Sequence, residues 1–156
     1  MARKPKKINT IGYEGLTVDA IMERLKEAGI DTLLDVRAVP LSRKPGFSKN
    51  RLSMHLQENG IEYVGLKGLG TPAEGRAAAR KGQLSSLRRI FEKHMKTEEA
   101  VRDLAHAVKV STSRKACLLC FEHAPSCCHR SIVAEKMKEK TGQEIEHLSV
   151  GPQYLL

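Results

Sequence analysis

The sequence predicts an α/β fold: a single open, mostly parallel five-stranded sheet with helices on both faces. Short apolar runs alternate with segments whose apolar residues recur every three or four positions, which is typical of strands alternating with amphipathic helices. The run Thr32–Val36, TLLDV, lacks polar alternation and suits a parallel strand covered on both faces. Gly29 and Gly142 each follow a helical segment, where glycine commonly ends a helix.

Five short apolar runs are the predicted strands, and the predicted helices lie between them. The strands are Ile8–Tyr13, Thr32–Val36, Ile61–Leu66, Lys115–Phe121 and Glu144–Val150. The helices begin after Thr17, after Ser48, near Leu84, at Thr97 and near Cys128. Residues 67–82 contain four glycines and one proline among small side chains, so we expect an irregular excursion there.

Residues 1–156 are predicted to form one α/β domain, with a basic N-terminal arm over residues 1–7 and a C-terminal tail over residues 151–156. No run approaches the roughly 18 apolar residues of a membrane span, and no signal-peptide pattern opens the chain. The four cysteines lie within residues 117–128, unlike the distributed cysteines of a secreted disulfide framework. We therefore expect a cytoplasmic protein without a membrane partner.

The charge of the chain is positive and unevenly distributed. There are 27 Lys and Arg residues against 18 Asp and Glu, which gives a net charge of +9. Residues 37–51 contain no acid and five basic side chains, Arg37, Arg43, Lys44, Lys49 and Arg51. Such a segment attracts phosphate-bearing ligands, although a solvated basic surface would have the same composition. Aromatic residues make up 4% of the chain, which leaves few platforms for stacking nucleic-acid bases.

Parallel strands place their carboxyl ends at one edge of a sheet, and ligands of open α/β sheets bind there. The predicted strands bring three short stretches to this edge, Gly12–Glu14, Asp35–Arg37 and Cys120–Glu122. We therefore expect the functional residues at this edge, with Gly12, Glu14 and Asp35 in supporting positions.

The segment Cys120–Arg130, CFEHAPSCCHR, runs from a strand end through a loop into a helix start. A helix start offers unpaired backbone N–H groups and the positive end of the helix dipole, and both favour an anion. Cys128, beside His129 and Arg130, would feel this field, which lowers the pKa of a thiol. Cys120 faces the same helix start from across the loop. Either cysteine could be the reactive thiol.

Other interpretations of these cysteines remain open. Cys117, in the middle of ACLLC, is expected to act as a small buried hydrophobic residue. A zinc site is another interpretation, if the loop folds back. Its ligands would be Cys120, His123, Cys127 or Cys128, and His129. Reversible pairing of Cys120 with Cys128 is a third. We expect neither a metal nor another cofactor.

Several motifs together resemble the family called domain of unknown function 488. They are TIGYEG, LLDVRAVPLSRKPGFSK, GIEYVGLKGLG and CFEHAPSCCHRSIVAEKM, which span nearly the whole chain. The matching positions are Thr10–Gly12, Asp35–Arg37, Pro40, Ser42–Arg43, Phe47–Lys49, Gly60–Tyr63, Cys120 with Glu122, and Cys128–Arg130. The resemblance implies a cytosolic domain without an established activity. Cys127 lies outside the pattern, which favours Cys120 and Cys128 as the functional cysteines.

A more distant similarity is to rhodanese-like sulfurtransferases and, more loosely, to cysteine-dependent phosphatases. It rests on the LLDVR strand, on the later strand that ends in cysteine, and on Arg130–Ser131 at a helix start. Those enzymes bind an anion in a loop between the cysteine and an arginine. Here nine residues separate Cys120 from Arg130, a longer loop than those enzymes use. The similarity implies an anion near Arg130.

The leading functional hypothesis is a thiol-dependent enzyme acting on a phosphate-bearing small molecule or a nucleic acid. Its catalytic residues would be Cys120, Cys128, His129 and Glu122, with His123 as a second proton carrier. Its anion-binding residues would be Arg37, Ser42, Arg43 and Arg130. The alternative is a non-catalytic nucleic-acid-binding module with a structural or metal-binding Cys/His cluster. The sequence predicts no oligomeric state.

Overall fold

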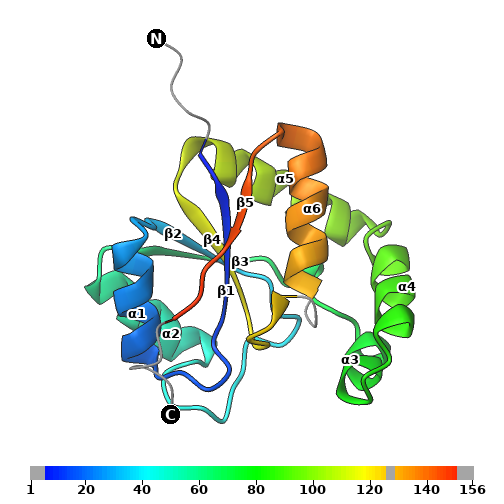
Figure 1. The fold of residues 1–156 in the computed structure, drawn as a ribbon, viewed down its shortest axis with the longest axis horizontal. Coiled ribbons are helices and arrows are strands. Elements are labelled where there is room, and N and C mark those ends of the chain that lie inside the picture. Colours follow the sequence, from blue (N-terminus) through cyan, green and yellow to red (C-terminus); the bar gives the residue numbers. More distant parts are fainter. Residues whose placement is uncertain (1–5, 126–128, 151–156) are drawn as a thin grey trace.

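The computed structural model describes residues 6–125 and 129–150, which form a five-stranded, all-parallel sheet with helices packed around it (Figure 1). The strands are β1 (Ile8–Gly12), β2 (Thr32–Asp35), β3 (Glu62–Gly65), β4 (Ala116–Cys120) and β5 (Ile145–His147), in the order β3-β2-β4-β1-β5. The helices are α1 (Val18–Glu27), α2 (Lys49–Glu58), the 3-10 turn η1 (Lys67–Leu69), α3 (Ala73–Arg80), α4 (Leu84–His94), α5 (Glu98–Ser113) and α6 (His129–Thr141). The predicted α/β class is confirmed.

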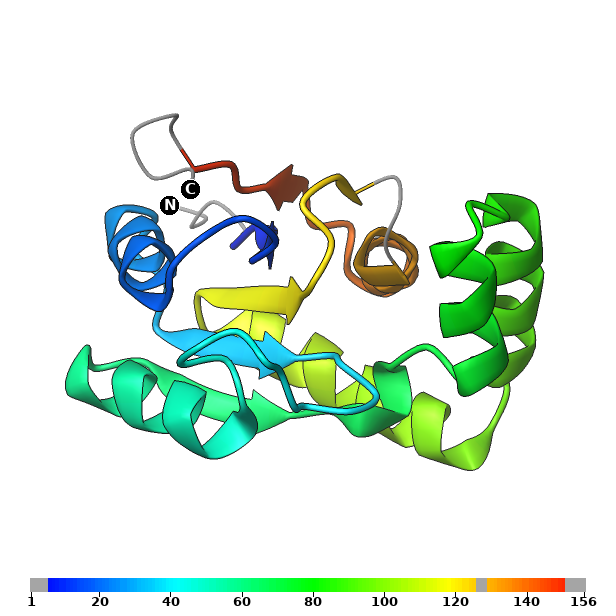
Figure 2. The ribbon, with the colours of Figure 1, turned by 90° about the horizontal axis from the view of Figure 1, so that it is seen from below.

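Helices cover both faces of the sheet (Figure 2). On one face α1 and α2 pack through Leu25 and Leu56. On the other face α4, α5 and α6 contribute Phe91, Leu104 and Val133 to a second core cluster. Every residue of β1, β2 and β4 is buried, which explains why these strands are nearly continuous apolar runs in the sequence.

The two cysteines of β4 belong to different faces of the sheet. Residues three apart in a strand point to opposite sides, so Cys117 lies in the cluster with α1 and α2, and Cys120 lies in the cluster with α4, α5 and α6. Cys117 is a free thiol with no exposed surface, and burial raises its pKa. The prediction that Cys117 is a buried apolar residue is confirmed.

Thr17 and Thr97 cap the N-termini of α1 and α5 with their side chains. The hydroxyl oxygen of Thr17 accepts a hydrogen bond from the Ala20 N–H at 3.1 Å, as predicted for an N-cap. Ser48 also occupies an N-cap position, that of α2, but its hydroxyl does not cap the helix. Instead it donates to the Ser42 carbonyl and accepts from the Ser42 N–H, both at 3.1 Å. Ser48 therefore ties the start of α2 to the basic loop before it.

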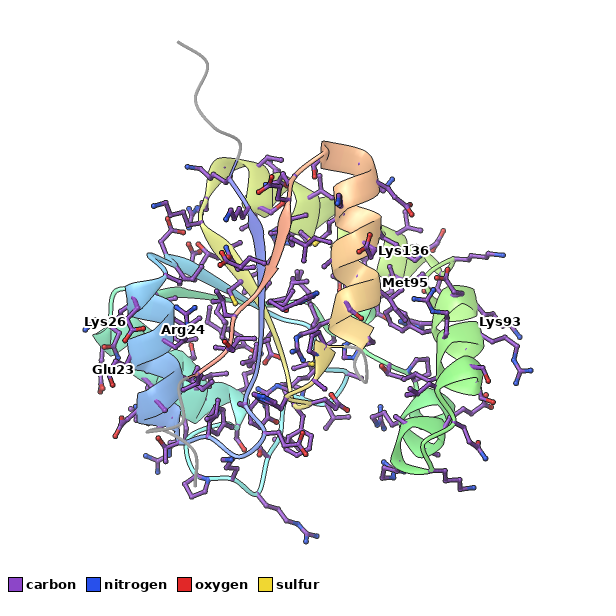
Figure 3. The ribbon with its side chains drawn as sticks, viewed as in Figure 1. Glu23, Arg24, Lys26, Lys93, Met95 and Lys136 are labelled. Carbon is purple, nitrogen blue, oxygen red and sulfur yellow. The ribbon has the colours of Figure 1, made fainter. Side chains whose placement is uncertain are left out.

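The packing of α4 against α6 combines apolar and charged contacts (Figure 3). Met95, at the end of α4, is 7% exposed and belongs to the core cluster. Lys136 extends from α6 toward α4, and its Nζ lies 2.8 Å from Oε2 of Glu92. This pair joins the two helices at the protein surface.

The irregular excursion predicted for residues 67–82 is wrong, because most of this segment is helical. Pro72 precedes α3 with a φ of −58°, which suits a helix start. Alanine has the highest helix propensity of any residue type, and the three alanines Ala77–Ala79 outweigh the helix-destabilising effect of the single glycine inside the helix. That glycine, Gly75, is buried where a Cβ would lie 2.4 Å from the Thr71 side chain and 3.5 Å from Leu87. It serves close packing of α3 against α4.

The predicted tail over residues 151–156 and most of the predicted basic arm lie outside the described residues. Among the described helices, none is long and apolar enough to cross a membrane.

Candidate functional site

The carboxyl ends of β1, β2 and β4 meet at one edge of the sheet. Gly12 is in register with Cys120, and Asp35 is in register with Leu119. Beyond β1 the chain still follows β4, since the Tyr13 N–H donates to the Cys120 carbonyl at 3.2 Å. Arg37 and Cys120 line the same cavity. The prediction that Gly12, Arg37 and Cys120 lie at one edge is confirmed.

Gly12 permits an unusually close approach of the loop after β4. A Cβ at this position would lie 1.8 Å from the Glu122 carbonyl oxygen and 2.9 Å from Nη1 of Arg130. No side chain could occupy that space without displacing the backbone of the loop. The glycine therefore sets the position of Glu122 and its neighbours relative to β1.

Arg130, on the first turn of α6, is fully buried and organises the loop after β4. Its Nε donates to Oγ1 of Thr10 at 3.1 Å, and its Nη2 donates to the His123 carbonyl at 3.0 Å. Its Nη1 donates to the Glu122 carbonyl and lies 3.2 Å from Sγ of Cys120. The predicted anion-binding arginine thus directs its guanidinium to the protein's own loop and to the sulfur.

Cys120 and Glu122 lie side by side at the end of β4. The Cys120 Sγ is 3.6 Å from the Glu122 Oε2, and the cysteine is 1% exposed. Cys120 is disulfide-bonded in this structure. Burial raises the pKa of the Glu122 carboxyl, and the charge of Arg130 opposes this shift. If the disulfide were reduced, the Glu122 carboxylate would lie within reach of the Cys120 thiol proton.

His129 is buried beside the same cavity as a neutral imidazole. Burial lowers its pKa to about 4, an effect that the hydrogen bond to Val36 only partly opposes. Its Nε2 lies 2.7 Å from the Val36 carbonyl oxygen, so Nε2 carries the proton and Nδ1 carries the lone pair. The ring thereby connects the start of α6 to the end of β2.

Arg37 forms a buried bidentate ion pair with Asp35. Its Nε and Nη2 each lie 2.8 Å from an oxygen of the Asp35 carboxylate. Its Nη1 donates to the Phe47 carbonyl at 2.6 Å, and the Tyr63 hydroxyl donates to Asp35 at 2.6 Å. Burial alone would lower the pKa of Arg37, but the hydrogen bonds and charge of Asp35 raise it. Most of the donors of this predicted anion-binding residue are therefore used within the protein.

A cavity of about 830 Å³ opens at this edge of the sheet. Cys120, Glu122 and His129 line it together with Arg37. Its more exposed lining is basic and includes Arg43, Arg76 and Arg80. The carboxylates in its lining are Glu14 and Glu122, so within the described residues its cations outnumber its anions. An anionic ligand would fit this charge balance.

Arg76 and Arg80 are site residues that the sequence analysis missed. Both come from α3, the helix that was expected to be irregular. The signal was present, since a helix through the alanine run puts residues four apart on one face. Arg76 also donates from Nη1 to the Thr71 carbonyl at 2.9 Å, whereas Arg80 is exposed and takes part in no ion pair of the described chain.

The remaining predicted site residues stabilise loops at the rim. The Ser42 hydroxyl accepts a hydrogen bond from the Lys44 N–H at 3.1 Å. The Glu14 carboxylate accepts one from the His123 N–H at 3.0 Å. Ser42 and Glu14 both line the cavity. Their hydrogen bonds fix the loops on either side of Cys120.

Cys128 and Cys127, named above as a reactive thiol and as a zinc ligand, lie outside the described residues. Among the residues that are described, no group of three or more His, Cys, Asp or Glu side chains could hold a metal ion. The described candidates for chemistry are therefore Cys120, Glu122 and His129.

The fold and the site define an all-parallel α/β domain with a basic cavity at the carboxyl edge of its sheet. Residues 17–137 match the family described as Domain of unknown function DUF488, and the chain belongs to this family. The family resemblance seen in the sequence is thus confirmed, and the family description assigns no activity. Neither a curated protein nor a solved structure matched the chain. The more distant similarity to rhodanese-like enzymes and phosphatases has no support from these comparisons.

Proposed function

We propose that this protein is a thiol-dependent enzyme that binds a phosphate-bearing substrate in the cavity at the carboxyl edge of the sheet. The observation that carries the proposal is the pairing of Cys120 with Glu122, 3.6 Å apart, in the same cavity as the basic side chains of α3. A thiol beside a carboxyl supplies a nucleophile and a proton acceptor. Arginines suit phosphate because their planar donors match its oxygens.

The proposed chemistry begins with the reduced Cys120 thiol. Glu122 takes the thiol proton, and the thiolate is stabilised by Nη1 of Arg130, 3.2 Å from the sulfur. The thiolate then bonds to an electrophilic atom of the substrate, and the departing group receives the proton from Glu122. We assign the proton transfer to Glu122 rather than to His129, because an imidazole with a pKa of about 4 is a weak base at neutral pH.

Because Cys120 is disulfide-bonded in this structure, a dithiol must first reduce that bond by thiol–disulfide exchange, which frees the Cys120 thiol and its partner thiol and leaves the dithiol oxidised to a disulfide. Cys128 is the second candidate for the reactive thiol, as the sequence suggested, and the same experiment distinguishes the two.

The test is the alkylation of the reduced, folded protein by iodoacetamide, with each cysteine followed by peptide mass spectrometry across a range of pH. Cys120, which lines the cavity, should react with an apparent pKa below the ordinary thiol value of about 8.5, while Cys117, which packs in the apolar cluster with α1 and α2, should not react. Inorganic phosphate should slow the reaction several-fold. Arg80→Glu should remove this protection, and Arg102→Glu, at an exposed position of α5, should keep it.

Two results would overturn the proposal. One is a Cys120 that reacts no faster than Cys117 in the folded, reduced protein. The other is a Cys120 alkylation rate that phosphate does not change. If alkylation at Cys128 alone is fast and is slowed by phosphate, the nucleophile of the proposal is wrong while its anion site stands.

A second candidate function is the non-catalytic nucleic-acid-binding module. The guanidinium groups of Arg37 and Arg130 donate their hydrogen bonds to other atoms of the protein. This favours the second candidate, because these arginines then stabilise the fold and do not bind substrate. In this function the cavity binds phosphate and no thiol reacts. Oligonucleotide binding that is equal in the native protein and in Cys120→Ser, combined with unreactive cysteines, would favour this candidate.

A further inference from the structure

A second cavity of about 410 Å³ lies beside the first, against the loop between β2 and α2. It is lined by Ser42, Arg43, Lys44, Ser48, Arg51 and His55, among others, and it shares Ser42 and Arg43 with the first cavity. No carboxylate belongs to its described lining. Within the described part of the chain Arg43, Lys44 and Arg51 take part in no ion pair. The Lys44 ammonium donates to the Tyr13 carbonyl at 3.3 Å, but no described carboxylate neutralises the three positive charges.

The basic surface continues around the loop. A third hollow of about 620 Å³ shares Ser48 and Arg51 with the second cavity and adds Lys49 and Lys67. It also contains no carboxylate in its described lining. Three adjoining hollows that are all lined by positive charge suit a ligand that carries several phosphates in succession better than a ligand that carries one.

The loop that separates these hollows is held in place before any ligand binds. Phe47 is fully buried and stacks on Tyr13 with ring centroids 4.3 Å apart. The Lys49 N–H donates to the Pro40 carbonyl at 2.9 Å. Together with the Ser42–Ser48 hydrogen bonds described above, these contacts fix the loop that carries Arg43 and Lys44, so little order has to be gained on binding.

Exposed apolar side chains stand between the basic ones. Leu41 is 71% exposed, Val39 is 48% exposed and Phe121 is 45% exposed, and all three line the first cavity. Phe121 offers an aromatic ring on which an unpaired base can stack, and Leu41 and Val39 offer further apolar contact, whereas a duplex keeps its bases stacked inside. The combination of apolar and cationic side chains favours a single strand.

We infer that the second cavity, around Arg51 and Lys44, is a subsite for a neighbouring phosphate, and that the substrate is therefore a single-stranded nucleic acid rather than a mononucleotide. The inference rests on the proposed function for the phosphate-bearing group in the first cavity. Arg43, which lines both cavities, lies where the strand passes from one to the other.

The test compares a fluorescein-labelled ten-nucleotide thymidine strand with thymidine 5′-monophosphate. Arg51→Glu should weaken binding of the strand by about tenfold, the loss of one charge-assisted phosphate contact. It should also reduce the slope of log K against log salt by about 0.7. Binding of the monophosphate, measured by calorimetry, should not change. Arg51 is the third residue of α2, where a glutamate favours the helix, so the variant should fold.

The matched control is Arg102→Glu, which makes the same charge change at an exposed position of α5 that lines none of the three hollows. Equal weakening by both variants would show a general charge effect and overturn the subsite. Tighter binding of a duplex of the same length would overturn the single-strand assignment. If the monophosphate does not bind but Arg51→Glu alone weakens the strand, the subsite stands and the proposed function falls. If phosphate protects Cys120 and Arg51→Glu leaves strand binding unchanged, the proposed function stands and the subsite falls.

Discussion

Arg130 Nη1 lies 3.2 Å from Cys120 Sγ, and the same guanidinium holds the carbonyls of Glu122 and His123. One buried cation therefore does two things at the edge of the sheet. It fixes the loop that follows β4, and it places a positive charge beside the sulfur. The geometry of this loop and the electrostatic environment of the Cys120 sulfur are thereby coupled to a single side chain.

Replacing Arg130 by lysine should damage both properties. A lysine keeps the charge but cannot reach Thr10, Glu122 and His123 together, so buried acceptors lose their donors at a cost of about 3 kcal/mol in the free energy of unfolding. In the reduced protein the pKa of the Cys120 thiol should rise because the charge moves away from the sulfur. Urea unfolding and the pH profile of alkylation measure the two effects. Arg114→Lys, at a half-exposed surface pair with Glu62, is the control and should cost less than about 1 kcal/mol. An Arg130→Lys protein as stable as this control would contradict the prediction.

Replacing Gly12 by alanine should displace the loop after β4. The added Cβ would lie 1.8 Å from the Glu122 carbonyl oxygen, and relief requires the backbone to move. We expect a loss of about 3 kcal/mol in stability, comparable to an overpacked core, and a loss of phosphate protection at Cys120. Gly65→Ala, where the nearest atom to the Cβ is 3.5 Å away, is the control. If the two alanine variants unfold at the same urea concentration, the close approach at Gly12 has no energetic consequence.

Replacing Asp35 by asparagine should leave the buried charge of Arg37 without its partner. Removal of one member of a buried ion pair costs about 3–5 kcal/mol, and this pair is nearly inaccessible, with side chains 1% and 6% exposed. The pKa of Tyr63, raised by burial and by its bond to Asp35, should fall, as followed by phenol absorbance in alkali. Asp31→Asn, at an exposed position, should change stability little.

If Asp35→Asn does not fold, Tyr63→Phe tests the same network, because it removes one hydrogen bond to Asp35 and should cost about 1 kcal/mol. A neutral effect of Tyr63→Phe would contradict this account of the network.

The sequence predicted the fold class because β1, β2 and β4 are buried on both faces and are therefore apolar throughout. It failed at α3, where the number of glycines was given more weight than the alanine run and its two arginines. For the site, the pairing of Asp35 with Arg37 had a sequence signal, since alternate residues of an extended segment share a face. The partners of Arg130 had none, because they include the backbone carbonyls of Glu122 and His123, whose positions exist only in the folded chain.

The last prediction concerns His129 and stability at acid pH. Burial lowers its pKa in the folded protein to about 4, against about 6.5 when unfolded. Between pH 6.5 and pH 4, His129 is therefore protonated in the unfolded chain but neutral in the folded protein. The free energy of unfolding should fall as the pH decreases from 6.5 to 4, by up to about 3 kcal/mol, and this contribution should level off below pH 4.

In His129→Gln, whose amide can still donate to the Val36 carbonyl, this part of the acid dependence should disappear. His106→Gln, at an exposed position of α5, should keep it. Urea unfolding at half-unit intervals of pH measures all three proteins. If the free energy of unfolding depends on pH equally in His129→Gln and in the native chain, groups other than His129 cause the acid sensitivity.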